Sequence, residues 1–406
     1  MKKFLLALRS SIIPSILLTL PIGSVYAFSL FSGEIATFTG LSLTNIQFAF
    51  SLSIFFLGMG ASFGGPLVEK NINVAGITSA LLFLLGLTTT CAGILYHNIW
   101  LIYIGYGLFN GLAQGIGYLT PVKTILLWFP RHKGLASSVS IISFGLGSSL
   151  CSLLFHFLFP IVGIQYIFLC LAAIYFPMMI VGSIFLRKPK YAVIKSKHNN
   201  IDFSYIKLFK DRYFIQSWLF MFLNISAGLA LIGVSVGIFK ELSVSQGTVI
   251  VLMALAGLFN GTFRLLFAWI SDILENRLNI WIIISSLSIF FMALSGLYFP
   301  SILASILLIN ATYGGGFSTC PSILSDNYDS NSLSRVHGAV LSAWGFAGLL
   351  GNNLSMMIFN MTGSFYFVVF MLIVMYLVNL ANVIILKKHC QKNKKTSPDY
   401  IDKGDN

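Results

Sequence analysis

Apolar runs long enough to cross a bilayer recur from residue 11 nearly to the end of the chain, and this feature restricts the fold more than any other. An α-helix needs roughly 20 apolar residues to span the hydrocarbon core. Only 9% of the 406 residues are charged, whereas about a quarter are charged in an ordinary soluble domain. The sequence therefore predicts an all-α membrane protein and leaves no room for a soluble catalytic domain.

Hydropathy predicts twelve transmembrane helices in two pseudo-symmetric six-helix bundles. The spans are expected near residues 11–31, 45–68, 74–95, 99–128, 134–158, 164–186, 213–238, 246–271, 279–298, 301–325, 336–360 and 363–386. The resulting organisation is an N-terminal bundle (1–186), a basic linker (187–212), a C-terminal bundle (213–387) and a disordered tail (388–406).

The basic residues predict the orientation of these spans. Of the 25 lysines and arginines, 22 fall on one side of the predicted membrane. Cytoplasmic loops are the ones that carry such an excess, so both termini, the linker and the tail are expected in the cytoplasm. Because membrane orientation explains this excess of basic residues, we expect no nucleic-acid partner. We expect a multi-pass protein of a bacterial inner membrane that functions as a monomer.

The cysteines and histidines do not indicate catalysis or metal binding. The five cysteines lack the spacing of a zinc site or a disulfide framework. The predicted spans contain no acid pair, no His-x-x-x-His motif and no credible triad. We therefore expect no enzyme activity, no metal and no cofactor.

The two halves contain similar segments. GIGYLTP at 115–121 resembles GGGFSTCP at 314–321, at an offset of six spans. Such internal duplication is typical of transporters whose halves rock around a binding site near the bilayer midplane.

Three longer stretches add to this pattern. They are PIGSVYAFSLF in span 1, GIGYLTPVKTILLWFPRHKGLASS in spans 4 and 5, and NGTFRLLFAWISDILENR in span 8. Together they resemble the major facilitator superfamily and, within it, the oxalate:formate antiporter family of small organic-anion carriers. The resemblance implies the major facilitator fold, anion exchange by alternating access, and a gating loop motif that contains Asp272 and Arg277.

The chain departs from this pattern at two places. The loop motif after span 2 is reduced to GGPLVEKN. In span 11, Trp344 stands near the position where the resemblance places a lysine. With one cation fewer near the midplane, the resemblance favours a monocarboxylate over the oxalate dianion.

Arg264 is the first candidate for binding substrate. It lies eight residues before Asp272, and is therefore roughly 12 Å inside the membrane. An arginine at that depth should face a cavity or a partner, and all twelve acidic residues fall in loops, tails or span ends. We expect the substrate to supply the negative charge; the alternative is that Arg264 binds backbone carbonyls or ties helices together.

Lys123, in span 4, is the second intramembrane cation, and it either contacts substrate or extends to the cytoplasmic interface. The resemblance implies that Tyr26 and Tyr118 surround the ligand, although packing would explain them equally well. The remaining candidates for the cavity wall are Trp344, Asn260, Gln114, Tyr313 and Phe317.

Two other functions stay open on sequence alone. A proton-linked carrier of a monocarboxylate such as pyruvate or lactate would have the same architecture. A membrane sensor that binds a ligand without moving it would need a signalling domain or an extended tail.

Overall fold

The structure is a computed structural model that describes residues 2–131, 133–189, 204–295 and 299–395, and these ranges contain helices and no strand. The first predicted span is a series of short helical elements. They are α1 (Lys2–Ala7), η1 (Leu8–Ile12), α2 (Ile13–Ile22), η2 (Gly23–Ala27) and α3 (Phe28–Thr39). The tighter 3-10 segment η2 follows Pro21, whose missing N–H and bulky ring disrupt a regular α-helix.

Longer helices form the rest of the N-terminal bundle. They are α4 (Leu43–Lys70), α5 (Ile72–Leu95), the continuous series α6 (Ile99–Ile102), η3 (Tyr103–Phe109) and α7 (Asn110–Trp128), and α8 (Lys133–Phe185). Helix α8 covers two predicted spans. The backbone leaves the helical conformation between them at Gly163, which has a left-handed φ of 68°. Polar caps fix several helix starts: Ser42 accepts a bond from the Asn45 N–H at 3.2 Å, and Asn71 accepts one from the Asn73 N–H at 2.9 Å.

The C-terminal bundle repeats this plan. The short α10 (Tyr205–Leu208) precedes α11 (Arg212–Glu241), α12 (Gln246–Ile273), α13 (Leu278–Leu294), α14 (Phe299–Leu324), α15 (Leu333–Thr362) and α16 (Phe365–Lys395). Helix α15 ends at Gly363, which takes a left-handed φ of 67° and so closes the helix without the steric cost that a side chain would add.

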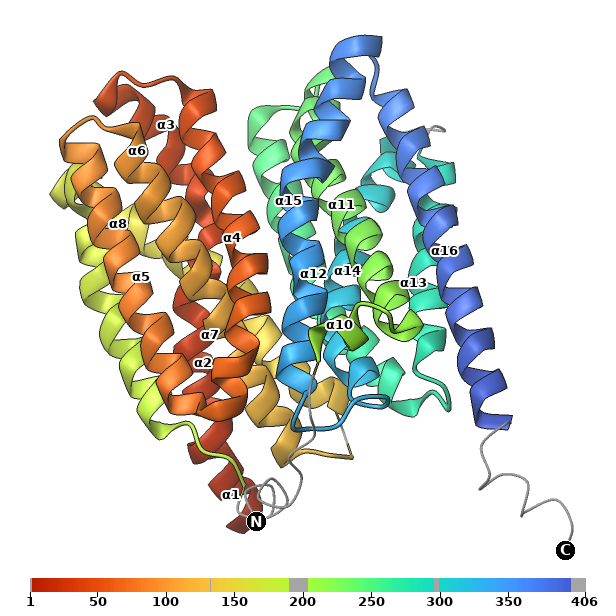
Figure 1. Ribbon diagram of the computed structural model, residues 1–406. Helices are drawn as coiled ribbons and strands as arrows, with labels where there is room; N and C mark the ends of the chain where they lie inside the picture. Colours follow the sequence, from red (N-terminus) through yellow and green to blue (C-terminus); the bar gives the residue numbers. More distant parts are fainter. Residues whose placement is uncertain (1, 132, 190–203, 296–298, 396–406) are drawn as a thin grey trace, which may run out of the picture.

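The two bundles stand side by side, with the first six spans on one side of the molecule and the last six on the other (Figure 1). We call the end at which α1 begins and α16 ends the terminal face. The bundles meet chiefly where α4 packs on α15 and where α8 packs on α12. At the first interface the backbones approach closely, since a Cβ atom on Gly338 would lie 2.2 Å from the Ala61 carbonyl oxygen.

The described helices account for all twelve predicted spans, so the predicted fold class is confirmed. One boundary differs from the prediction. Helix α16 continues to Lys395, so residues 388–395 are helical instead of belonging to the predicted disordered tail. Most of the predicted linker (190–203) and the rest of the tail (396–406) lie outside the described residues.

Candidate functional site

Arg264 lies on α12 and is buried, with 3% of its surface exposed. Its Nε donates to the Asn260 side-chain oxygen at 3.0 Å, one turn earlier on the same helix. Its Nη1 donates to the Ile141 carbonyl oxygen at 2.9 Å, on α8 of the opposite bundle. Asn260 is fixed in turn, because its Nδ2 donates to the Asn310 carbonyl oxygen of α14 at 3.1 Å. The guanidinium is thus oriented at the boundary between the bundles.

No carboxylate pairs with Arg264 in the part of the chain that the structure describes. The hydrogen bonds from its Nε and Nη1 go to neutral oxygens. A buried cation normally has a counter-ion, because leaving water costs it several kcal/mol. The positive charge of Arg264 is therefore not neutralised by a described residue, and the site can accept an anion.

Aromatic side chains of the C-terminal bundle surround this guanidinium. Its central carbon lies 5.8 Å from the centre of the Phe317 ring. Phe317 contacts Tyr313 on α14 at 5.3 Å and Trp344 on α15 at 4.4 Å between ring centres. These residues form the first wall of the site.

The N-terminal bundle supplies the second wall through Tyr26, Tyr118 and Phe144. The Phe144 ring lies 5.5 Å from Tyr26, 5.8 Å from Tyr118 and 5.8 Å from Trp344 of the opposite bundle. Tyr118 also lies 5.9 Å from Trp344. We call these six rings and Arg264 the aromatic cage; its rings are Tyr26, Tyr118, Phe144, Tyr313, Phe317 and Trp344.

Besides the guanidinium, the aromatic rings of the cage carry four hydrogen-bond donors. The hydroxyls of Tyr26, Tyr118 and Tyr313 and the indole N–H of Trp344 are buried and make no hydrogen bond of good geometry with the described residues. The Tyr26 hydroxyl nevertheless lies beside Tyr313 and Arg264. Buried polar groups are rarely left unpaired, and phenols, an indole and a guanidinium can all donate to an anion.

Two glycines allow the helices of the cage to approach one another. A Cβ atom on Gly23 would lie 1.8 Å from the Phe144 carbonyl oxygen, so this glycine lets the first span bring Tyr26 against α8. A Cβ atom on Gly314 would lie 2.4 Å from the Asn260 carbonyl oxygen and 3.0 Å from Cγ of Arg264. Larger residues would displace the groups that hold the guanidinium.

The structure therefore brings together seven of the nine residues predicted to bind substrate. They are Arg264 with its partner Asn260, and Tyr26, Tyr118, Trp344, Tyr313 and Phe317. Gln114 lies one helical turn before Tyr118 on α7, and its buried side-chain oxygen has no hydrogen-bond partner among the described residues.

Lys123 does not join the cage. Its ammonium pairs with the Glu69 carboxylate of α4, and the two side chains are only 5% and 6% exposed. The other Glu69 oxygen accepts a 2.7 Å hydrogen bond from the Ser334 backbone N–H at the start of α15. Lys123 thus lies outside the aromatic cage and reaches towards the terminal face, where it belongs to a contact between the bundles that we call the Glu69 contact.

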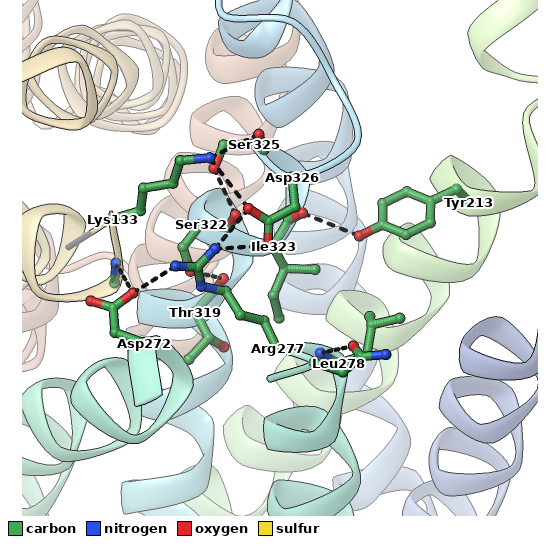
Figure 2. Close-up of polar contacts among 12 residues, drawn as sticks. Lys133, Tyr213, Asp272, Arg277, Leu278, Thr319, Ser322, Ile323, Ser325 and Asp326 are labelled. Atoms are coloured by element: carbon green, nitrogen blue, oxygen red, sulfur yellow. Dashed lines mark hydrogen bonds and ion pairs between the residues drawn. The ribbon is translucent and has the colours of Figure 1, made fainter. Parts of the chain in front are cut away.

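A second contact at the terminal face involves both residues of the predicted gating motif (Figure 2). Asp272 accepts bonds from the Gly134 backbone N–H at 3.0 Å and from Arg277 at 3.1 Å. Arg277 also binds both oxygens of Asp326, at 2.7 and 2.8 Å, and Lys133 reaches Asp326 at 3.3 Å. We call this network the Asp272 contact. Burial lowers the pKa of Arg277, but its bonds and charge interactions with Asp326 and Asp272 outweigh burial and raise it.

The two contacts are related by the pseudo-symmetry of the bundles. Glu69 ends α4 and binds the first turn of α15, whereas Asp272 ends α12 and binds the first turn of α8. In each case a carboxylate meets backbone N–H groups at a helix N-terminus, where negative charge is stabilised. Together the contacts hold the bundles against each other at the terminal face.

Sequence reasoning missed three buried residues of this region. Glu69 directly follows the predicted span 45–68, and its position in GGPLVEKN corresponds to Asp272 in the later motif, which is the signal that could have identified it. His337, inside predicted span 11, was not considered, and its burial could have been inferred from that span. Phe144 carries no signal in its residue type, because phenylalanine is common throughout the chain.

Two curated proteins are similar to most of the chain. An uncharacterized MFS-type transporter, YhjX of Escherichia coli strain K12, is 26% identical over 349 residues, or 84% of this chain and 85% of the relative. The oxalate:formate antiporter of Oxalobacter formigenes is 24% identical over 345 residues, or 82% and 80%. Apicoplast pyruvate carrier 1 of Toxoplasma gondii is 33% identical over only 69 residues, or 17% and 13%. The predicted resemblance is thus confirmed.

Solved transporter structures share the fold. The fucose transporter FucP in its outward conformation matches with a TM-score of 0.70 at 13% identity, over 92% of this chain and 97% of that one. A bacterial homologue of ferroportin in an outward-facing state matches with a TM-score of 0.73 at 11% identity, over 93% and 98%. The family model for the Major Facilitator Superfamily matches residues 12–352. The chain therefore belongs to the Major Facilitator Superfamily, as a multi-pass membrane transporter of small molecules and not an enzyme.

Proposed function

We propose that this transporter carries a small organic anion with a single carboxylate, and that it does so by alternating access coupled to anion exchange. The observation that carries the proposal is the buried Arg264, which has no carboxylate partner among the described residues and faces unpaired donors of the aromatic cage. A carboxylate would supply both the missing charge and the missing acceptors.

The chemistry of the cage supports this ligand class. A guanidinium offers a planar fork that matches a carboxylate, and such charge-assisted hydrogen bonds are about twice as strong as neutral ones. The ring centres of neighbouring cage residues lie 4.4 to 5.9 Å apart, so the rings are in direct contact. Only a ligand of few atoms could enter between them without large movements of the rings. A single arginine in the cage favours one negative charge over two.

The relatives support the same class of cargo. One relative is named an oxalate:formate antiporter, and another, which matches a short stretch, is named a pyruvate carrier. All three anions in those names are small carboxylates. Trp344 in place of the lysine expected from the resemblance favours formate-like or pyruvate-like ligands.

The terminal-face contacts support alternating access. They close the bundles together on the side that we propose to be cytoplasmic, in agreement with the outward states of the similar solved structures. Transport would then require both contacts to break while the cage opens towards the opposite side of the membrane.

A proton-linked symporter of a monocarboxylate is the second candidate function. The observation that favours it is His337, a buried imidazole beside Tyr118 whose Nε2 has no hydrogen-bond partner among the described residues. Anion exchange alone needs no group that titrates near neutral pH.

The test is uptake of labelled formate, acetate, lactate, pyruvate and oxalate into proteoliposomes that contain the purified protein. Each anion is measured with and without unlabelled anion inside, and with and without an inward proton gradient. We expect a monocarboxylate to enter fastest, and internal anion to stimulate it. Stimulation only by the proton gradient would replace exchange by symport, and failure of every anion with a folded protein would overturn the proposal.

Arg264→Lys keeps the charge but loses the planar fork, so we expect it to lower uptake strongly while the protein still folds. Arg131→Gln is the matched control, because Arg131 is exposed at the terminal face and outside the cage. Full uptake by purified Arg264→Lys would show that the guanidinium serves the fold and not the cargo.

A further inference from the structure

His337 lies on α15 in an enclosed position that the transport site does not explain. The residue is buried, and Nε2 has no hydrogen-bond partner among the described residues. Its ring lies 6.0 Å from the ring of Tyr118, a member of the aromatic cage. A buried imidazole usually fixes its tautomer through a hydrogen bond to its second nitrogen, so this one is available to gain a proton or a ligand.

The position of His337 along α15 places it between the cage and the terminal face. Three residues earlier, the Ser334 N–H binds Glu69 in the contact that closes the bundles. Seven residues later, or about 10 Å along the helix axis, Trp344 lines the cage. The next residue, Gly338, packs against Ala61 of the opposite bundle. An anion that leaves the cage towards the terminal face must therefore pass His337 once α4 and α15 separate.

The other basic groups near His337 lie closer to the terminal face. Arg335, two residues earlier on α15, and Lys188 both act electrostatically on Lys123, and Lys188 also donates to the Glu69 carbonyl oxygen at 3.5 Å. Helix α7 contributes Tyr118 and, further towards the terminal face, Lys123, which is neutralised by Glu69 of α4. Helix α14 contributes the Cys320 thiol near Tyr118. Helix α11 has no charged residue between positions 213 and 239, and its Tyr213 hydroxyl donates to the Ile323 carbonyl oxygen.

The surroundings of His337 must change during alternating access. With the terminal face closed, the imidazole is enclosed without an anion beside it, which favours its neutral form. When the bundles separate at α4 and α15, water reaches the ring, and the hydrated imidazole can take up a proton near neutral pH. Its positive charge would then attract an anion that moves between the cage and the cytoplasm.

We infer that His337 is a proton-binding site of the transport cycle, which takes up a proton when the terminal face is open and binds the carboxylate as the anion enters or leaves on that side. This inference rests on the proposed function and deepens it, because it makes movement of the anion depend on a proton. Proton and anion then bind with positive coupling. By linkage each raises the affinity for the other by the same factor.

The expected signature is a pH dependence of anion affinity that disappears with the imidazole. Protonation adds a positive charge, so the apparent affinity for the anion rises as pH falls. We measure exchange of the best monocarboxylate of the panel in proteoliposomes clamped at equal pH on both sides, from about pH 5.5 to 8, which brackets the ordinary histidine pKa of about 6.5. For the unmodified protein we expect the half-saturating anion concentration to fall at least about fivefold as the pH is lowered from about 8 to about 5.5.

The variants separate this inference from the proposed function. His337→Gln should still exchange the anion at about pH 8, with a half-saturating concentration that no longer changes with pH, and His337→Asn provides a second variant if glutamine impairs folding. His156→Gln is the matched control, because His156 is an exposed histidine on α8, and it should keep the pH dependence of the unmodified protein. During net uptake into vesicles without internal anion, a pH-sensitive dye inside should report protons that accompany the anion in the unmodified protein and not in His337→Gln.

Two results would overturn the role of His337 and leave the proposed function standing. One is exchange by the unmodified protein whose half-saturating concentration does not change with pH, together with net uptake that brings no protons into the vesicles. The other is an unchanged pH dependence in folded His337→Gln. Absence of anion transport at every pH would instead overturn the proposed function itself.

Discussion

Arg264 and Lys123 are both buried cations within the spans, but the structure gives them opposite surroundings. Lys123 pairs with the buried carboxylate of Glu69, near the terminal face. Arg264 lies beside the rings of the aromatic cage and donates to an amide and a carbonyl oxygen, with no carboxylate partner in the part of the chain that the structure describes. Depth in the membrane alone therefore does not identify a binding residue. The presence or absence of a counter-ion separates a cation that holds helices together from one that can hold a ligand.

The largest effect is expected from breaking the Lys123–Glu69 pair. Glu69→Gln leaves the Lys123 charge buried without a partner, and such a change costs about 3–5 kcal/mol. We expect the free energy of unfolding of the purified protein to fall by this amount. The double variant Glu69→Gln with Lys123→Met removes both charges and should recover most of the loss. A double variant no more stable than Glu69→Gln would show that the pair contributes little and that the Ser334 hydrogen bond accounts for the effect.

Removing the charge of Arg264 should impair transport more than stability, the reverse of the effect expected for Glu69→Gln. Arg264→Gln gives up two hydrogen bonds to neutral oxygens, each worth about 1 kcal/mol, but takes away no partner from a carboxylate. We expect anion uptake to fall about 100-fold, which corresponds to roughly 2.7 kcal/mol, with a smaller loss of stability than in Glu69→Gln.

Lys123→Gln is the comparison for this variant, and it should keep more uptake than Arg264→Gln while losing more stability. Uptake and thermal unfolding of the same protein preparations measure both quantities. Equal loss of uptake in the two variants would place Lys123 in the transport site.

The sequence was sufficient to predict the spans, because a membrane helix is encoded by the length of an apolar run and its loop charges. It was also sufficient to select Arg264, since an intramembrane arginine is rare and visible in one chain. The pairing of Glu69 with Lys123 was not predicted. Those residues are 54 positions apart, and only the packing of α4 on α7 brings them together.

The aromatic cage shows the same limit. Aromatic residues make up 15% of the chain, so residue type alone could not separate Phe144 from the many that pack elsewhere. Tyr26 was selected from its motif, but the 3-10 segment after Pro21 that positions it depends on backbone geometry. Predicted spans give the elements of the site, whereas contacts between helices decide which side chains meet.

A smaller effect is expected at the Asp272 contact than at the Glu69 contact. Asp272 is itself only 4% exposed, but its partners Arg277 and Asp326 are 19% and 35% exposed, so water and salt screen this contact more than the buried Lys123–Glu69 pair. We expect Asp272→Asn to open the terminal face about tenfold more often, or roughly 1.4 kcal/mol. The rate at which a cysteine introduced at Ala61 is alkylated measures this opening, in a background without the five natural cysteines.

Salt sharpens the same comparison. High salt should reduce the difference between Asp272→Asn and the unmodified protein, because screening weakens the contact in the latter. It should leave the effect of Glu69→Gln nearly unchanged. Identical salt dependence at the two sites would contradict the distinction between a buried and a partly exposed contact.

The smallest effect concerns the charge of the cage and is expected from Trp344→Lys. The variant introduces a second cation near Arg264 and Phe317. Its attraction to a second carboxylate at about 4 Å is about 4 kcal/mol at an effective dielectric constant of about 20, and the cost of burying the ammonium offsets most of this gain. Removing the indole also loosens the packing against Tyr118 and Phe144, so part of this gain is offset. We expect the affinity for oxalate relative to formate to rise about fivefold, measured by competition against labelled formate.

Trp344→Met, which removes the ring without adding charge, is the control. A similar shift in both variants would mean that cavity size selects the anion, whereas a shift in Trp344→Lys alone would show that the single positive charge of the cage sets its preference for a monocarboxylate.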